Sequence, residues 1–249
     1  MKNLKTKITS FIILITFFSC SSAQEQLEEI VEESVAEKHL FILSGQSNMV
    51  GLKEEQSFIP ELITAFAEDE IVIVKEAKGS QPISQWYKNW KSPSGESANT
   101  GTEIYNKLLL KVNTAIEKDT FKTVTFVWMQ GERDARLSYG TVYEESLIGL
   151  HNQLQNALLR FDVNFVIGRL SDFDMKNTRY PDWTLVRSVQ EKVGDSNPRF
   201  GWINTDDLND GIVRNGVAIE NDLHMSWIGY KIMGERFAQK AIEIINDNE

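Results

Sequence analysis

One serine stands where a hydroxyl could act as a nucleophile: Ser47, in the block Gly-Gln-Ser-Asn-Met at positions 45–49. The apolar run before it, 40–44, has the composition of a strand buried on both faces. A side chain that follows such a strand lies at the carboxyl edge of the sheet, where open α/β sheets bind ligands. The alternative is that Ser47 caps the next helix or turn. The block differs from the Gly-x-Ser-x-Gly elbow of α/β-hydrolases, because Met49 replaces the second glycine.

A base for this serine is available near the other end of the chain. The sequence has three histidines, and two of them have a structural explanation, since His39 precedes a strand pattern and His151 lies in an amphipathic helix pattern. His224 stands before the last helix pattern, two residues after Asp222. A carboxylate at this spacing can hold the imidazole tautomer and stabilise the imidazolium. Ser47, His224 and Asp222 are therefore a candidate catalytic set.

Two further patches follow strand patterns and could donate hydrogen bonds to an oxyanion. Gly79 comes after the strand pattern at 71–76, and a glycine lets a backbone N–H approach a ligand closely. Gln130 follows the pattern at 123–129 and has an amide that can donate to developing negative charge. Glu132 is predicted to orient this loop rather than to react. Taken singly, each patch is also explained by a turn or a helix start.

The order of the apolar patterns predicts an α/β fold that brings these patches together. Strand patterns alternate with helical ones, which is typical of a parallel sheet with helices on both faces. Strands are expected at 40–44, 71–76, 123–129, 164–169 and 201–204. Helices are expected at 104–116, 143–158, 186–193 and 228–245, where apolar residues recur every three or four positions. With 249 residues, 41% of them hydrophobic, the chain can bury the core of one such domain.

The patches, taken in order, resemble one family of esterases. The blocks at 45–49, Gly79, Gln-Gly-Glu at 130–132 and Asp-Leu-His at 222–224 are similar to those of the SGNH (GDSL-type) hydrolases. The resemblance is to the carbohydrate esterase branch that includes sialate O-acetylesterases and some acetylxylan esterases, and it extends from about residue 40 to 237. It implies a three-layer α/β/α sandwich with a central, mainly parallel five-stranded sheet, the flavodoxin-like SGNH hydrolase fold.

The resemblance also implies a role for each matching residue. Ser47 would be the nucleophile, His224 its base and Asp222 the orienting acid. The backbone amides of Ser47 and Gly79, with the Gln130 side chain, would form the oxyanion hole. No metal and no organic cofactor is expected, and the acidic stretches at 172–174 and 206–211 lack the ligand register of a calcium loop.

One position departs from the family pattern. Many SGNH enzymes carry the acid three residues before the histidine, where this chain has Asn221. The role of Asp222 is thus open at this stage, with Glu220, Asp206 and Asp207 as the alternatives. The residues expected to support the site or to bind substrate are Gln46, Asn48, Glu132, Arg133 and Arg169.

The first 38 residues differ in composition from the rest of the chain. A lysine-rich start, an apolar run at 8–18 and small residues after it predict a signal peptide over residues 1–23. Two kinds of processing remain open: lipidation of Cys20, the chain's only cysteine, or cleavage after Ala23. Residues 24–38 form an acidic tether, and 39–249 the hydrolase domain. The expected location is outside the cytoplasm, either periplasmic or secreted, or lipid-anchored at the cell envelope.

The charge of the chain limits its partners. The formal net charge is −10, and removal of residues 1–23, which carry three lysines and no acid, makes it −13. A surface with this much negative charge disfavours binding to nucleic acid and to anionic membranes. An acetylated glycan is the expected partner, and a membrane only through a lipid on Cys20.

The predicted function is a serine esterase that removes O-acetyl groups from an extracellular carbohydrate through an acetyl-enzyme. Two alternatives remain: a catalytically silent glycan-binding or scaffold protein on the same fold, or an esterase of non-sugar short-chain esters. Trp86, Tyr87 and Trp90, in the irregular stretch 79–101, could stack on sugar rings or plug this loop onto the core. Arg133, and Arg169 with Asp172, are expected to face the same edge.

Overall fold

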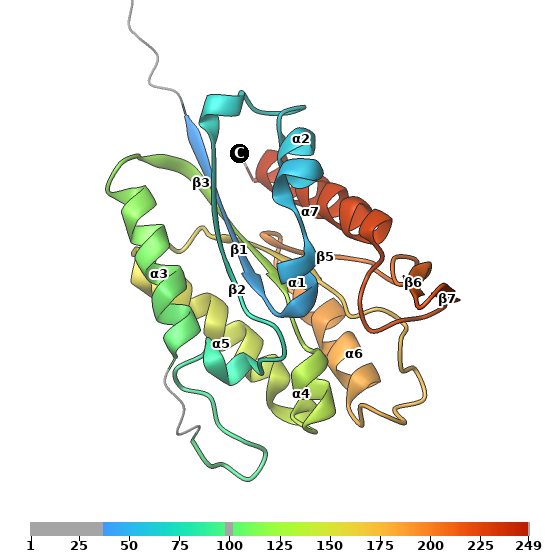
Figure 1. Cartoon of the computed structure of the whole chain (residues 1–249). Coiled ribbons are helices and arrows are strands. Elements are labelled where there is room, and N and C mark those ends of the chain that lie inside the picture. Colours follow the sequence, from blue (N-terminus) through green and yellow to red (C-terminus); the bar gives the residue numbers. More distant parts are fainter. Residues whose placement is uncertain (1–36, 98–101, 249) are drawn as a thin grey trace, which may run out of the picture. The chain divides into compact units, whose positions relative to one another are not determined.

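A sheet of five parallel strands forms the centre of the computed structural model, which describes residues 37–97 and 102–248 (Figure 1). The strands are β1 (Lys38–Gly45), β2 (Ile71–Ala77), β3 (Phe121–Met129), β4 (Asn164–Gly168) and β5 (Phe200–Ile203). Their order in the sheet is β2-β1-β3-β4-β5. Every neighbouring pair is parallel. The predicted flavodoxin-like order and all five expected strands are confirmed, each within two residues at either end.

Helices cover both faces of this sheet and complete the three layers. One face carries α3 (Glu103–Ile116), α5 (Gly140–Leu158) and α6 (Trp183–Gly194), and the other carries α2 (Phe58–Leu62) and α7 (Trp227–Asp247) (Figure 1). In α5 the apolar residues at the predicted spacing are buried from Tyr143 to Leu154, and Leu158 is partly buried. The central strands β1 and β4 and most of β3 are buried from both sides, which explains their near-continuous apolar sequences.

Several short elements were not expected. Helices α1 (Ser47–Gly51) and α4 (Glu132–Arg136) begin just after β1 and β3, and one-turn 3₁₀ helices form at Glu54–Gln56, Glu68–Glu70 and Ile83–Gln85. Strands β6 (Ile212–Arg214) and β7 (Val217–Ile219) form an antiparallel hairpin. Its turn is Asn215-Gly216, both with positive φ, which is the Asn-Gly signature of a tight hairpin.

The irregular loop after β2 is plugged onto the core. Trp86 is fully buried, packs edge-on against Trp128 with ring centres 5.2 Å apart, and donates its Nε1 hydrogen to Ser44. Trp90 is 5% exposed and packs on Tyr139. These two indoles thus anchor the loop, and of the two readings that the sequence left open the structure supports the structural one.

The predictions for the start of the chain lie outside the described residues. The signal segment 1–23 and nearly all of the tether 24–38 belong to this part. Within the described residues, no helix has both the length and the apolar character needed to cross a membrane.

Candidate active site at the carboxyl edge of the sheet

Ser47 is placed by a tight junction at the end of β1. Gly45 has φ +145°, and a Cβ there would lie 2.0 Å from the carbonyl oxygen of Met129, so only glycine lets the ends of β1 and β3 come this close. The N–H of Gln46 donates to that same oxygen at 2.9 Å. The chain then turns into α1, whose first residue is Ser47.

The Ser47 hydroxyl faces the imidazole of His224. The distance from Ser47 Oγ to His224 Nε2 is 3.1 Å, within hydrogen-bond range, although 177 residues separate the two in the sequence. No side-chain cap is formed at the start of α1, so the reading of Ser47 as a helix cap finds no support. Such a pair is the geometry that serine activation by a general base requires.

The other two histidines belong to the core. His39 Nδ1 lies 2.8 Å from Thr123 Oγ1, and His151 Nε2 lies 2.9 Å from the carbonyl oxygen of Val163. Both rings are buried, and burial lowers the pKa of His151 to about 4. Each therefore has the structural role that its sequence position indicated.

Asp222 is the acid that faces His224. Its Oδ1 accepts the backbone N–H of His224 at 2.9 Å and lies 3.8 Å from His224 Nδ1, an ion-pair distance longer than a hydrogen bond. The residue before it, Asn221, has φ +52°, and its side-chain oxygen accepts a hydrogen bond from Asn209 Nδ2 at 2.8 Å. This left-handed residue turns the chain so that the acid two positions before the histidine, rather than three, reaches the ring.

The alternative acids are placed elsewhere. Glu220 is exposed. Asp206 accepts from Arg169 and Arg187, and Asp207 is paired with Arg236 at 2.7 Å. Of these acids and Asp222, only Asp222 has a carboxylate oxygen within ion-pair distance of His224 among the described contacts.

Asn48 joins the nucleophile loop to the base loop. Its Nδ2 donates to Glu132 Oε1 at 2.8 Å and to the carbonyl oxygen of Leu223 at 3.2 Å. Its Oδ1 accepts from the N–H of Met225 at 3.3 Å and from the Tyr230 hydroxyl at 3.1 Å. The buried amide thus contacts the residues on both sides of His224, which fixes where the imidazole stands relative to Ser47.

The backbone of Gly79 lies beside Ser47. A Cβ on Gly79 would be 3.7 Å from the Cβ of Ser47, so the loop after β2 passes directly against the serine. Neither the Ser47 nor the Gly79 N–H donates a hydrogen bond to another of the residues that the structure describes. Two unused donors beside a nucleophile are what an oxyanion hole needs.

The third predicted donor, Gln130, has a different role. Its side chain is fully buried, and its Nε2 lies 2.5 Å from Asp134 Oδ2, 3.1 Å from the carbonyl oxygen of Gln81 and 3.2 Å from Gln46 Oε1. An amide has only two hydrogens to donate, and these internal acceptors use them. The prediction of Gln130 as an oxyanion donor is therefore corrected, because the side chain ties the loops together from beneath the site.

Gln46 completes the same internal network. Its Oε1 also accepts the backbone N–H of Arg133 at 3.2 Å, and the side chain is 3% exposed. Gln46 thus connects the end of β1 to the start of α4, as a supporting residue should.

Two carboxyl groups lie buried under the site. Glu132 is 2% exposed and Asp134 fully buried. Burial raises the pKa of each to about 7, and the charge of Asp134 adds to the effect on Glu132. Asp134 also accepts the N–H of Ile83 at 2.9 Å, which holds the loop after β2 in place. The role of Asp134 was not predicted, although it stands four residues after Gln130, one helical turn away.

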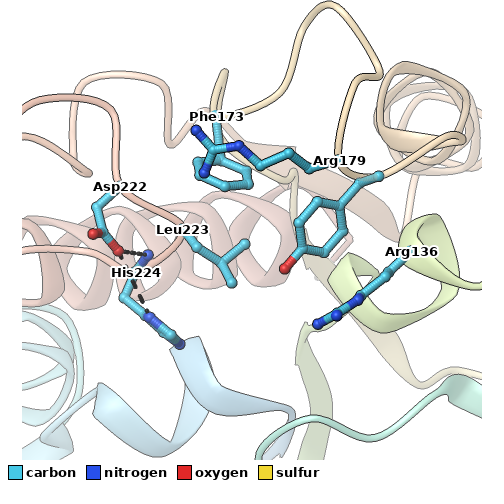
Figure 2. Close-up of a pocket in the computed structure, with 7 residues that line it drawn as sticks. Arg136, Phe173, Arg179, Asp222, Leu223 and His224 are labelled. Carbon is cyan, nitrogen blue, oxygen red and sulfur yellow. Dashed lines mark hydrogen bonds and ion pairs between the residues drawn. The ribbon is translucent and has the colours of Figure 1, made fainter.

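Two adjoining pockets open at Ser47 and His224. The smaller has a volume of about 100 Å³ and is lined by Gln46, Ser47, Ser80, Glu132, Arg133, Arg136, Tyr180, Leu223 and His224. The larger, of about 330 Å³, is lined by Arg136, Phe173, Arg179, Tyr180, Asp222, Leu223 and His224 (Figure 2). The two share four residues, so an ester at Ser47 has room beside it for a larger group.

Of the two arginines predicted at this edge, only Arg133 lines the site. Arg169 is bonded to Glu191, Asn204 and Asp206, and its guanidinium lies 4.8 Å from the centre of the Trp202 ring. The prediction that Arg169 contacts substrate is thus corrected, because its terminal N–H groups donate to Glu191, Asn204 and Asp206. The pocket residues Arg136, Phe173, Arg179 and Tyr180 were not predicted. The last three lie in an aperiodic loop, whereas Arg136 was detectable three residues after Arg133.

The described residues contain no group of three or more His, Cys, Asp or Glu side chains that could hold a metal ion.

A family model described as "carbohydrate esterase, sialic acid-specific acetylesterase" matches residues 50–243, well over half of the chain. The chain belongs to this carbohydrate esterase family. The SGNH-type, sialate O-acetylesterase-like resemblance and the enzyme class, a carbohydrate O-acetylesterase, are thereby confirmed. No curated protein matches the sequence significantly.

Solved structures share the fold of this esterase. A protein from Arabidopsis thaliana is 16% identical with a TM-score of 0.62, over 83% of this chain and 98% of its own. NanS is 12% identical with a TM-score of 0.61, over 85% and 98%. A carbohydrate acetylesterase from Xanthomonas citri is 16% identical with a TM-score of 0.58, over 82% of this chain and 56% of its own. Because the sequence identities are this low, these structures show only that the chain shares their fold.

Proposed function

We propose that this esterase hydrolyses O-acetyl esters of an extracellular carbohydrate with Ser47 as the nucleophile. The observation that carries the proposal is the 3.1 Å contact between Ser47 Oγ and His224 Nε2. The unused N–H groups of Ser47 and Gly79 support it, as does the membership of the family. The pocket of about 100 Å³ at Ser47 suits a short acyl group such as acetyl.

The proposed reaction begins when Ser47 Oγ attacks the ester carbonyl and His224 Nε2 takes the hydroxyl proton. The carbonyl oxygen becomes an oxyanion that accepts the two N–H groups, each typically worth about 3 kcal/mol. His224 then protonates the sugar oxygen as it leaves, and an acetyl-enzyme remains. Water, deprotonated by His224, then attacks this ester, and His224 returns the proton to Ser47 Oγ as acetate is released. Asp222 stabilises the imidazolium that forms in both halves of the cycle.

Hydrolysis of p-nitrophenyl acetate by wild type and by Ser47→Ala tests the nucleophile. Ser188→Ala, which removes a hydroxyl from a solvent-facing position of α6, is the matched control and should retain full activity. We expect the Ser47 variant to lose at least about 10⁴-fold in kcat. Equal rates for the Ser47 variant and wild type would exclude serine catalysis. Acetate release from acetylated glycans, compared with simple short-chain esters, then separates a carbohydrate esterase from an esterase of non-sugar esters.

The silent glycan-binding alternative loses its main support. It rested on the displaced acid, and Asp222 faces His224 in spite of the shifted spacing. We retain export as part of the proposal, because the lysine-rich start and apolar run of residues 1–23 favour it. Labelling with radioactive palmitate tests lipidation of Cys20, and a label-free protein in the culture medium would indicate cleavage without lipid.

A further inference from the structure

A second pair of adjoining pockets lies along β5, an edge strand of the sheet. The larger has a volume of about 480 Å³ and the smaller one of about 230 Å³, and they share Trp202, Lys240 and Glu243. Neither contains a residue of the two pockets at Ser47 and His224. Together they form one groove, here called the β5 groove, between the end of α6 and the second half of α7 (Figure 1).

Trp202 is the aromatic wall of the β5 groove, and its ring is held in place from several sides. The Arg169 guanidinium lies 4.8 Å from the ring centre, and the indole Nε1 donates to Asp195 Oδ1 at 3.0 Å. Gly194 lets the ring come close, since a Cβ there would lie 2.7 Å from Trp202 Cδ1. The indole stays partly exposed and lines both pockets. A pre-positioned indole that opens into a groove is a surface on which a sugar ring can stack.

The charges of the β5 groove favour a neutral ligand. Its ionisable lining residues are the acids Asp195, Glu243 and Asp247 and the bases Arg236 and Lys240. Both bases are already paired with carboxylates: Lys240 Nζ lies 2.6 Å from Glu243 Oε2, and Arg236 Nη1 lies 2.7 Å from Asp207 Oδ1. An anion would therefore meet an excess of negative charge and two cations that are already neutralised.

The backbone edge of β5 offers little to another peptide strand. Ile203 accepts a hydrogen bond from the chain that continues β4, so Phe200 and Trp202 are the strand residues whose backbone groups face outward. The N–H of Phe200 is already bonded within its own turn at 2.9 Å, and Arg236 Nη1 donates at 2.9 Å to the carbonyl oxygen of Asn204, which follows the strand. Strand addition needs a longer run of free edge groups, so a peptide is disfavoured as the occupant.

We propose that the β5 groove binds neutral sugar units of a polymeric glycan, with one ring stacked on Trp202. Side-chain amides of the lining, those of Asn197 and Gln239, supply donors and acceptors for sugar hydroxyl groups. In the sheet order β5 lies three strand spacings from β1, about 14 Å. The groove therefore holds a part of the glycan other than the ester that reaches Ser47.

A second contact with the same glycan has a kinetic consequence. A polymer bound in the β5 groove keeps its acetyl groups near Ser47 at a raised effective concentration, so KM for a polymeric substrate falls. A small ester cannot occupy the groove and Ser47 at once, so its KM is unaffected. This consequence rests on the proposed esterase function, whereas binding in the groove does not.

The test titrates Ser47→Ala, which removes the nucleophile, with xylohexaose, mannohexaose and cellohexaose. Hexagalacturonic acid is the anionic counterpart. The readout is the indole N–H resonance of Trp202 in nitrogen–proton correlation spectra, identified by its absence from the spectrum of Trp202→Ala. The chain has six tryptophans, so the other five indoles are internal references.

Two double variants on α7 provide the comparison. Lys240→Ala with Glu243→Ala removes an ion pair that lines both pockets and leaves Trp202 as the reporter. Lys231→Ala with Glu235→Ala removes an ion pair of the same helix that lies outside both pockets, and is the matched control. Both are made in the Ser47→Ala parent.

We expect at least one neutral hexasaccharide to shift the Trp202 resonance to saturation, and hexagalacturonic acid to leave it unchanged. The Lys240 and Glu243 double variant should bind that hexasaccharide about fivefold to tenfold more weakly, because sugar hydroxyl groups lose partners, and the control should bind as the parent does. The hexasaccharide that binds identifies the sugar. The proposal would be overturned by no shift with any neutral ligand, by an equal shift with the acid, or by parental affinity in the groove variant.

Kinetics with the serine restored tests the consequence for the esterase. With the acetylated polysaccharide of the sugar that binds, KM should rise about fivefold or more in Trp202→Ala and in the groove variant. With p-nitrophenyl acetate, kcat/KM should stay at the wild-type value in both. Equal losses on the two substrates would contradict a separate glycan contact. If wild type hydrolyses no ester, the proposed function fails, and the titration still decides whether the groove binds sugar.

Discussion

Replacing Asp222 by Asn isolates the charge that faces His224. The amide oxygen of Asn can still accept the backbone N–H of His224, which the carboxylate accepts at 2.9 Å, so the loop keeps this bond. What is lost is the negative charge 3.8 Å from Nδ1. Two unit charges at this distance interact by about 4 kcal/mol at an effective dielectric constant of 20. Solvent around the imidazole, which is 38% exposed, reduces this to about 3 kcal/mol.

The variant is therefore expected to lose about 100-fold in kcat, because the imidazolium forms only during the reaction and KM should change little. Steady-state hydrolysis of p-nitrophenyl acetate at pH 7.5 or thereabouts measures this, with circular dichroism to confirm the fold. Glu220→Gln removes an exposed charge from the same loop and should retain wild-type kcat. A loss below threefold for Asp222→Asn, or an equal loss for the Glu220 control, would refute the assignment of Asp222.

Three further predictions concern the supporting residues. Asn48→Ala removes four hydrogen bonds, two of them to the residues on either side of His224, so kcat should fall by about 100-fold or more in steady-state assays. An unchanged kcat would show that the His224 loop keeps its position without Asn48. Burial raises the pKa of Glu132 from 4.5 to about 7, so its contribution to stability, about 3 kcal/mol, is present below pH 4.5 and lost as pH rises through 7. In urea unfolding, the free energy of unfolding should therefore decline less between pH 5 and 8 in Glu132→Gln than in wild type. Parallel pH dependences of wild type and variant would contradict this. Gly45→Ala should cost more than about 3 kcal/mol, measured by thermal unfolding, because its Cβ would meet the Met129 carbonyl; a wild-type Tm would disprove the steric reasoning.

Two features were predictable from the sequence: the strands of the sheet, and the close approach of the polar patches that follow them. Strands buried on both faces leave continuous apolar runs, and the carboxyl ends of parallel strands meet at one edge of the sheet. Ser47, Gly79 and Gln130 follow three neighbouring strands, so their approach was foreseeable from their positions in the sequence. The sequence could also exclude His39 and His151, since each lies in a regular element.

Hydrogen-bond partners were not predictable, because they depend on side-chain positions in three dimensions. The amide of Gln130 and the guanidinium of Arg169 have the right chemistry and stand at the right edge, yet internal acceptors take their hydrogens. The pocket residues Arg179 and Tyr180 lie in a loop without periodicity or motif, so no pattern marked them. The displaced acid was explained only by the left-handed conformation of Asn221.

The long sequence separation of the two reacting side chains has a consequence for how activity can be used. Ser47 lies near the start of the sequence and His224 near its end. Asn48 can bond Leu223 and Met225, and so position His224 beside Ser47, only after the loop that carries His224 has packed in place. Fragments that stop before residue 224 therefore lack the base, however well their strands pair. Ester cleavage by this protein is thus a readout of completed folding, and a colorimetric acetate ester would report, in a single measurement, how much of a preparation has reached the native state.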